Sequence, residues 1–170
     1  KQMAMSAGFE KVFEIGPVFR ADPSFTSRHN TEFTGYDAEM SFIDSHHDVM
    51  DEEEKLLVEI IKRVQEEYSE EIEKLFNREL IVPTTAFPRI PFAKAKEILK
   101  AQGVTSDKVA DLSPEEEKAI GEYARINHNS EFVFIIDYPT AGRAFYSQKY
   151  EDKPETSKTL WLGIWRFKKD

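Results

Sequence analysis

Residues 18–40 read VFRADPSFTSRHNTEFTGYDAEM, and this stretch decides the architecture of the first part of the chain. Residues 11–20 have the composition of a strand, residues 21–30 are rich in turn formers, and residues 31–43 form a second extended run. We therefore expect an antiparallel hairpin with a long loop over residues 11–43. The loop brings two arginines and a histidine next to a strand that carries acids and a Phe.

The second strand has two different faces, because side chains alternate along a strand. Its odd positions include Phe33, Gly35, Asp37 and Glu39, which make a poor core and a plausible floor for a ligand. Its even positions are mainly apolar toward the end of the strand and are expected to belong to the core; they are Glu32, Thr34, Tyr36, Ala38, Met40 and Phe42.

Residue chemistry on the odd face suits a nucleotide. A ring such as Phe33 stacks on a planar base with roughly 1–3 kcal/mol, and Gly35 leaves room for close approach. Arg20 offers a planar fork for phosphate oxygens, with Arg28 and His29 available for more distal phosphates. Pairs of acids and arginines are also common on solvated hairpins, and a lone exposed Phe is uninformative. Spacing alone leaves both interpretations open.

The remaining chain alternates helices and strands. Apolar residues at helical spacing predict a long helix over residues 48–76, and three prolines make residues 83–92 a connector. Shorter helices are expected over residues 93–102 and after Ser113-Pro114. Residues 132–137 (FVFIID) are apolar on both faces and predict a central strand, with further strands over residues 144–150 and 157–167. The predicted fold class is α+β, an antiparallel sheet flanked by helices.

Composition excludes several classes of protein. The 170 residues include 40% hydrophobic residues and 13 Phe, which argues against disorder, and the net charge of −9 argues against a surface that grips nucleic acid everywhere. No apolar run reaches the ~18 residues of a membrane span, and the first residues do not resemble a signal peptide. The absence of Cys suits a reducing cytoplasm. The adjacent His46 and His47 are more often surface residues at a helix start than ligands, so no metal site is predicted.

The stretch FRADPSFTSRHNTEFTGYDAEM resembles motif 2 of the class II aminoacyl-tRNA synthetases, in particular the aspartyl enzymes of archaeal and eukaryotic type. KQMAMSAGFEKVFEIGPVFR is similar to that family's approach to the motif. PFAKAKEIL, FVFIIDYP and AFYSQKYEDKPETSK resemble its later segments in the same order, so the resemblance covers most of residues 1–158. Asp22 and Asn30 depart from the family pattern within the motif.

The resemblance implies an aspartate–tRNA ligase, which activates aspartate with ATP and attaches it to tRNA. It makes Arg20 the catalytic residue, holding the α-phosphate of ATP and the activated carboxylate. Arg28 and His29 would serve the terminal phosphates, Glu32 the adenine amino group, and Phe33 would lie under adenine. ATP is then a substrate, and Mg²⁺ is expected for the family although its ligands are not seen in this sequence.

For the amino acid, the resemblance places Asp37 and Glu39 near the pocket and Arg143 beside the aspartate side chain. A simple loop role for Arg143 fits the sequence equally well. The run T-G-Y-D at residues 34–37 favours aspartate over asparagine, whose synthetases usually carry larger residues there.

The resemblance also implies a domain layout. Residues 1–170 would be a partial catalytic domain with the motif 2 hairpin at 11–43, a helical insertion at about 83–130 and C-terminal strands at 131–167. Motif 1, motif 3 and the anticodon-binding domain of these homodimeric, cytoplasmic enzymes have no counterpart in the sequence, so the isolated chain is expected not to aminoacylate tRNA. The alternatives are a catalytically idle module that binds a nucleotide or a partner protein, and a relative of the asparagine–tRNA ligases.

Overall fold

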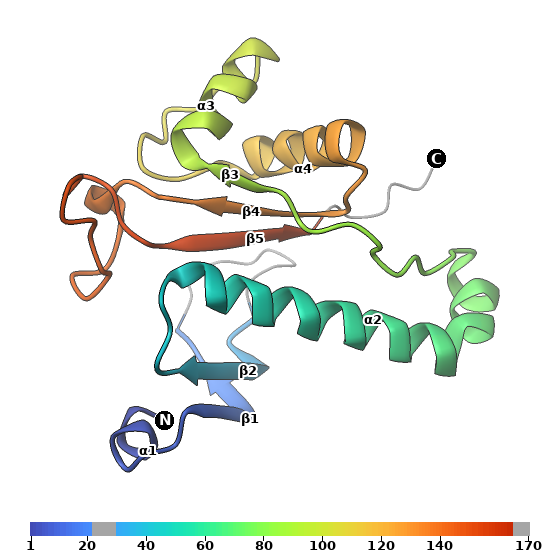
Figure 1. Ribbon diagram of the computed structural model, residues 1–170. Coiled ribbons are helices and arrows are strands. Elements are labelled where there is room, and N and C mark those ends of the chain that lie inside the picture. Colours follow the sequence, from blue (N-terminus) through green and yellow to red (C-terminus); the bar gives the residue numbers. More distant parts are fainter. Residues whose placement is uncertain (22–29, 165–170) are drawn as a thin grey trace. The chain divides into compact units, whose positions relative to one another are not determined.

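The computed structural model describes residues 1–21 and 30–164 and divides the chain into two units, Lys1–Val49 and Met50–Asp170 (Figure 1). Asp22, Arg28, His29 and Trp165 lie outside the described residues.

The first unit is a helical turn followed by the expected hairpin. Helix α1 (Gln2–Ser6) ends before Gly8, whose φ of +104° favours glycine. Strands β1 (Lys11–Phe19) and β2 (Glu32–Met40) pair antiparallel, from Lys11 opposite Met40 to Phe19 opposite Glu32. A further hydrogen bond from the Arg20 amide to the Thr31 carbonyl, 2.9 Å long, extends the ladder toward the loop.

The even-numbered face of β2 is not a buried core in the described residues, contrary to expectation. Phe13, Ile15 and Phe19 of β1 share this face with Tyr36, and each of the four side chains is exposed. The rings of Phe13 and Tyr36 stack with centroids 5.8 Å apart. A two-stranded sheet has no second layer of its own, so it cannot bury an apolar face without further elements.

In the second unit, helix α2 (His46–Phe76) covers one face of a small sheet, and helices α3 (Phe92–Ala101) and α4 (Pro114–His128) cover the other (Figure 1). Helix α2 begins with the last residues of the first unit, where the Ser45 hydroxyl accepts from the His47 amide. The sheet runs in the order β3 (Arg89–Pro91), β4 (Phe132–Ile136) and β5 (Leu160–Ile164), with β4 in the centre as predicted.

Each face of this sheet buries its own apolar cluster, because all five residues of β4 are buried and alternate between the faces. One cluster joins Phe132, Phe134 and Ile136 to Met50 of α2. The other joins Val133 and Ile135 to helices α3 and α4. Ser113 caps α4, and its capping box with Glu116 explains why the helix begins where the sequence predicts.

Three expectations differ from the structure. The connector at residues 83–92 contains the short strand β3, which pairs parallel to β4, so the sheet is mixed rather than antiparallel. A parallel return needs a crossover, and α3 and α4 provide it. Residues 144–150 form turns after a short 3-10 helix, η1 (Thr140–Gly142), instead of a strand, with isolated bridges at Pro139–Thr156 and Lys149–Ser157. Among the described residues, no helix has the length and apolar character to cross a membrane.

Candidate active site

The odd-numbered positions of β2 share a face with the even-numbered positions of β1, because the register pairs residues of opposite parity. Phe33 lies opposite Val18, and Asp37 lies opposite Glu14. Between these two pairs, Gly16 lies opposite Gly35. The face thus has an aromatic end, a bare backbone in the middle and a carboxylate end.

At the aromatic end the structure brings Arg20 and Phe33 together. The guanidinium carbon of Arg20 lies 5.6 Å from the centroid of the Phe33 ring. The Phe33 side chain is partly accessible, with 37% of its surface exposed. A cation beside an accessible ring forms a surface that a base and a phosphate group can use together.

The two glycines in the middle have different surroundings. A Cβ on Gly35 would lie 2.8 Å from the Val18 methyl group, so the neighbouring strand restricts this position. A Cβ on Gly16 would meet nothing within 4 Å. The open space on this face therefore lies over Gly16, whereas the Val18 methyl group fills the space over Gly35, where the sequence had predicted room for close approach.

At the carboxylate end a lysine lies between acids. The Lys1 ammonium is 2.7 Å from Asp37 and 3.8 Å from Glu14, and 15% of the Lys1 side chain is exposed. The hydrogen bond to Asp37 raises the Lys1 pKa, burial opposes the rise, and the charges of Asp37, Glu14 and Glu39 add to it. Sequence reasoning missed Lys1 and Glu14. Alternation on the first strand could have placed Glu14, but only the position of α1 beside β1 reveals Lys1.

The other candidate residues are not gathered at this face. Glu32 is opposite Phe19 and therefore points to the other side of the hairpin, at the first position of β2. In the second unit, Arg143 donates to the Ala110 carbonyl and pairs with Asp111. Arg28 and His29 fall outside the described residues.

A metal ion has no evident ligand set in the part of the chain that the structure describes, where no group of three or more His, Cys, Asp or Glu side chains is suitably placed. The rings of His46 and His47 contact each other, with their centroids 4.6 Å apart. The acids at the hairpin face are bridged by the Lys1 ammonium, which is a poor setting for Mg²⁺ because the cation would compete with a fixed positive charge.

Comparison with known proteins decides the family. The family described as tRNA synthetases class II (D, K and N) matches residues 1–162. The chain belongs to this family.

The relatives specify the group within it. The chain is 45% identical over 162 residues to the aspartate–tRNA(Asp) ligase of Pyrococcus abyssi, covering 95% of this chain and 37% of that protein. It is 45% identical over 165 residues to the aspartate–tRNA(Asp/Asn) ligase of Methanoculleus marisnigri, covering 95% and 36%. The synthetase segment described here thus spans over a third of the length of these relatives.

Solved structures show the same fold. The aspartyl-tRNA synthetase of Entamoeba histolytica superposes with a TM-score of 0.87 at 34% identity, covering 96% of this chain and 34% of the other. The asparaginyl-tRNA synthetase of Pyrococcus horikoshii in complex with asparaginyl-adenylate superposes with a TM-score of 0.81 at 29% identity, covering 95% and 36%. The class II synthetase fold, with α+β architecture, is therefore the fold of this chain.

Proposed function

We propose that this chain forms part of the ATP and aspartate site of an aspartate–tRNA ligase. The observation that carries the proposal is the Arg20 guanidinium beside the accessible Phe33 ring, on the hairpin face that also bears Asp37. The names of the relatives support aspartate as the amino acid, since the two described above are aspartate–tRNA ligases. The complete protein would use ATP, aspartate and tRNA, and by family resemblance would be a cytoplasmic homodimer that takes ATP with Mg²⁺.

The chemistry assigned to the aromatic end is positioning and charge stabilisation. A carboxylate oxygen of aspartate attacks the α-phosphorus of ATP, the bond from that phosphorus to the bridging oxygen breaks, and pyrophosphate leaves. The planar guanidinium of Arg20 can grip two oxygens at once, so it holds the α-phosphate as negative charge develops there. Phe33 fixes the adenine by stacking. By family resemblance, Arg28 and His29 would serve the terminal phosphates. The Glu32 side chain lies on the opposite face of the hairpin from Phe33, so the geometry does not support the role at the adenine amino group that the resemblance implies for it.

The carboxylate end suits the amino acid. Aspartate has one ammonium and two carboxylates, and this end of the face has Asp37 and Glu39 as acids and Lys1 as a cation. Because the Lys1 ammonium already pairs with Asp37 and Glu14, Glu39 would hold the substrate ammonium, and Lys1 would attract the side-chain carboxylate. Such an arrangement disfavours asparagine, whose neutral amide gains less from a lysine.

Calorimetric titration with ATP tests the aromatic end directly. We expect the 170-residue chain to bind ATP and Arg20→Ala to bind it roughly ten- to a hundred-fold more weakly, because a charged bidentate contact is lost. Arg63→Ala is the matched control, since this arginine pairs with Glu59 on the exposed side of α2. Equal affinity of Arg20→Ala and Arg63→Ala would reject the assignment of Arg20.

A further inference from the structure

We propose that Arg143 is a positioning residue that joins the turn after β4 to the loop between α3 and α4, so that the α3–α4 insertion sets the course of residues 137–150. This role differs from the substrate contact that the family resemblance implies for Arg143. It concerns the second unit alone and does not depend on the proposed function.

The Arg143 side chain makes three contacts inside the second unit. Its guanidinium donates to the Ala110 carbonyl at 3.0 Å and lies 3.4 Å from the Asp111 carboxylate. The guanidinium carbon is 4.6 Å from the centroid of the buried Tyr138 ring. Only 21% of the side chain is exposed, and its Nε is buried without an acceptor among the described residues. The ring and the two oxygen partners therefore balance its charge, and all three of these contacts lie within the second unit.

Gly142 brings the turn and the loop into direct contact. A Cβ on this residue would lie 2.7 Å from the Ala110 Cβ and 3.0 Å from the Ala110 oxygen. The backbone of Gly142 does not adopt a positive φ. A glycine is therefore needed here because Ala110 approaches so closely, and not because of the backbone conformation. The glycine and the following arginine thus act on the same residue of the loop, Ala110.

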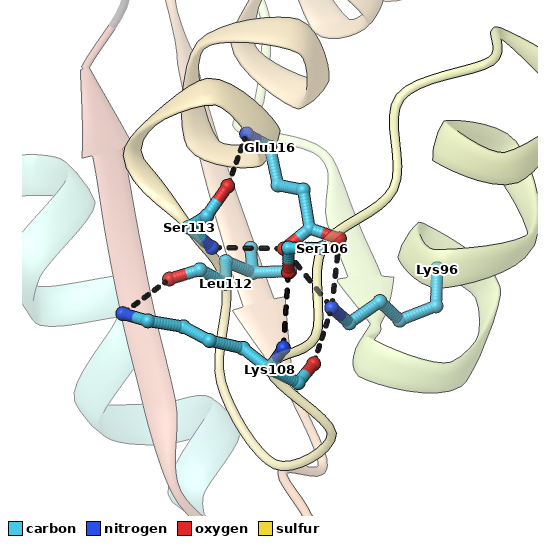
Figure 2. A network of polar contacts seen from close by, with 6 residues as sticks. All are labelled: Lys96, Ser106, Lys108, Leu112, Ser113 and Glu116. Carbon is cyan, nitrogen blue, oxygen red and sulfur yellow. Dashed lines mark hydrogen bonds and ion pairs between the residues drawn. The ribbon is translucent and has the colours of Figure 1, made fainter.

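The loop is itself firmly anchored at its other end, as Figure 2 shows. The Glu116 carboxylate, 2% exposed, accepts hydrogen bonds from Lys96, from the Ser106 hydroxyl at 2.7 Å and from the Ser113 amide at 2.8 Å. Lys96 also donates to the Lys108 carbonyl at 2.8 Å. Both helices of the insertion therefore hold the loop, which makes it a fixed support for Arg143.

Hydrogen bonds connect the turn to the segment that follows it. Asp137, with a φ of +60°, accepts a 2.7 Å hydrogen bond from the Tyr150 hydroxyl. Burial and then this hydrogen bond raise the Tyr150 pKa to about 12, so the hydroxyl remains a donor at physiological pH. Thr140 is bonded to the Pro154 and Glu155 carbonyls on the far side of the segment. A shift of the turn at Arg143 therefore also moves the segment that these hydrogen bonds hold. This segment includes Phe145, whose side chain is almost fully exposed.

Hydrogen exchange resolved by segment tests the proposal on the full 170-residue chain. For Arg143→Ala we expect exchange of the amides in Val104–Leu112 and Ala144–Tyr150 to rise roughly tenfold or more, with Phe132–Ile136 of β4 unchanged. Arg143→Lys keeps a cation over the Tyr138 ring and should restore part of the protection. Arg63→Ala on α2 is the control and should leave both segments unchanged.

Gly142→Ala separates the proposed role from a substrate contact, because it leaves the arginine in place. We expect it to increase exchange in the same two segments, and Ala110→Gly in the same chain to reverse part of the effect by removing the opposing Cβ. Normal protection of Val104–Leu112 in both Arg143→Ala and Gly142→Ala would overturn the proposal. Loss of protection throughout β4 in both variants would overturn it as well, since the contact would then support the whole unit and not position one segment.

Discussion

Glu116 combines deep burial with a retained negative charge. Burial alone would raise its pKa, but the hydrogen bonds from Lys96, Ser106 and the Ser113 backbone outweigh burial and leave the pKa below its ordinary value. A buried carboxylate with three donors is a strong local constraint, because removing it leaves those donors without their acceptor.

Glu116→Gln should therefore lower the free energy of unfolding of the second unit by about 3 kcal/mol, as breaking a buried ion pair does. Urea unfolding followed by circular dichroism measures the change. Glu97→Gln is the matched control, since Glu97 pairs with Lys94 in an exposed i,i+3 arrangement, and exposed pairs contribute far less to stability than buried ones. Similar losses for the two variants would mean that Glu116 is not a special constraint.

The same carboxylate predicts a pH dependence. A group whose pKa is depressed by folding stabilises the protein above its unfolded pKa, and this contribution disappears as pH falls through the lower folded pKa. The stability gap between wild type and Glu116→Gln should thus be full above about pH 4.3 and close in more acidic solution. A gap that stays constant from neutral pH into strong acid would contradict this.

At the scale of elements, the hairpin has a steric asymmetry that a pair of matched variants can measure. Gly35→Ala places a methyl group 2.8 Å from Val18 Cγ2, whereas Gly16→Ala meets nothing within 4 Å. Gly35→Ala should lower hairpin stability by roughly 1 kcal/mol through overpacking, and Gly16→Ala should not. Exchange rates of the β1 and β2 amides provide the measurement; equal rates in the two variants would show that Val18 moves aside at no cost.

Helix α2 carries two glutamates with opposite expected effects. Burial raises the pKa of Glu53, so its charge destabilises the folded state at neutral pH, whereas a hydrogen bond from Arg63 lowers the pKa of Glu59. Glu53→Gln should raise the thermal midpoint at neutral pH, with the gain lost in acid where the native carboxyl is already neutral. Glu59→Gln should lower the midpoint slightly. A lower midpoint for Glu53→Gln would contradict the burial argument.

The elements whose signal lies entirely within their own residues were predictable from the sequence. Apolar periodicity predicted α2, the Ser113-Pro114 pair predicted the start of α4, and the apolar run predicted β4 as central strand. Strand β3 was missed because prolines surround it and its pairing with β4 is non-local. Residues 144–150 have the composition of a strand, but hydrogen bonds such as Ser147 to the Ala144 carbonyl turn the chain there instead.

At the scale of the whole molecule, the geometry of the candidate site was predictable where a single strand determines which side chains share a face. Alternation placed Phe33 and Asp37 on one face, and the register adds Arg20 to it. Lys1 was missed because its contact with Asp37 depends on packing between a helix and a strand. Arg143 could not be assigned from sequence, since its partners lie more than thirty residues away in the α3–α4 loop.

The central claim is that the hairpin face binds an activated aspartate. The most direct test is calorimetric titration of the 170-residue chain with a non-hydrolysable analogue of aspartyl-adenylate, compared with the asparaginyl analogue. We predict tighter binding of the aspartyl analogue, a roughly ten- to hundred-fold loss in Arg20→Ala, and a loss of about 1–3 kcal/mol in Phe33→Ala. Binding that is unchanged by both substitutions, or no binding to the wild-type chain, would contradict the account.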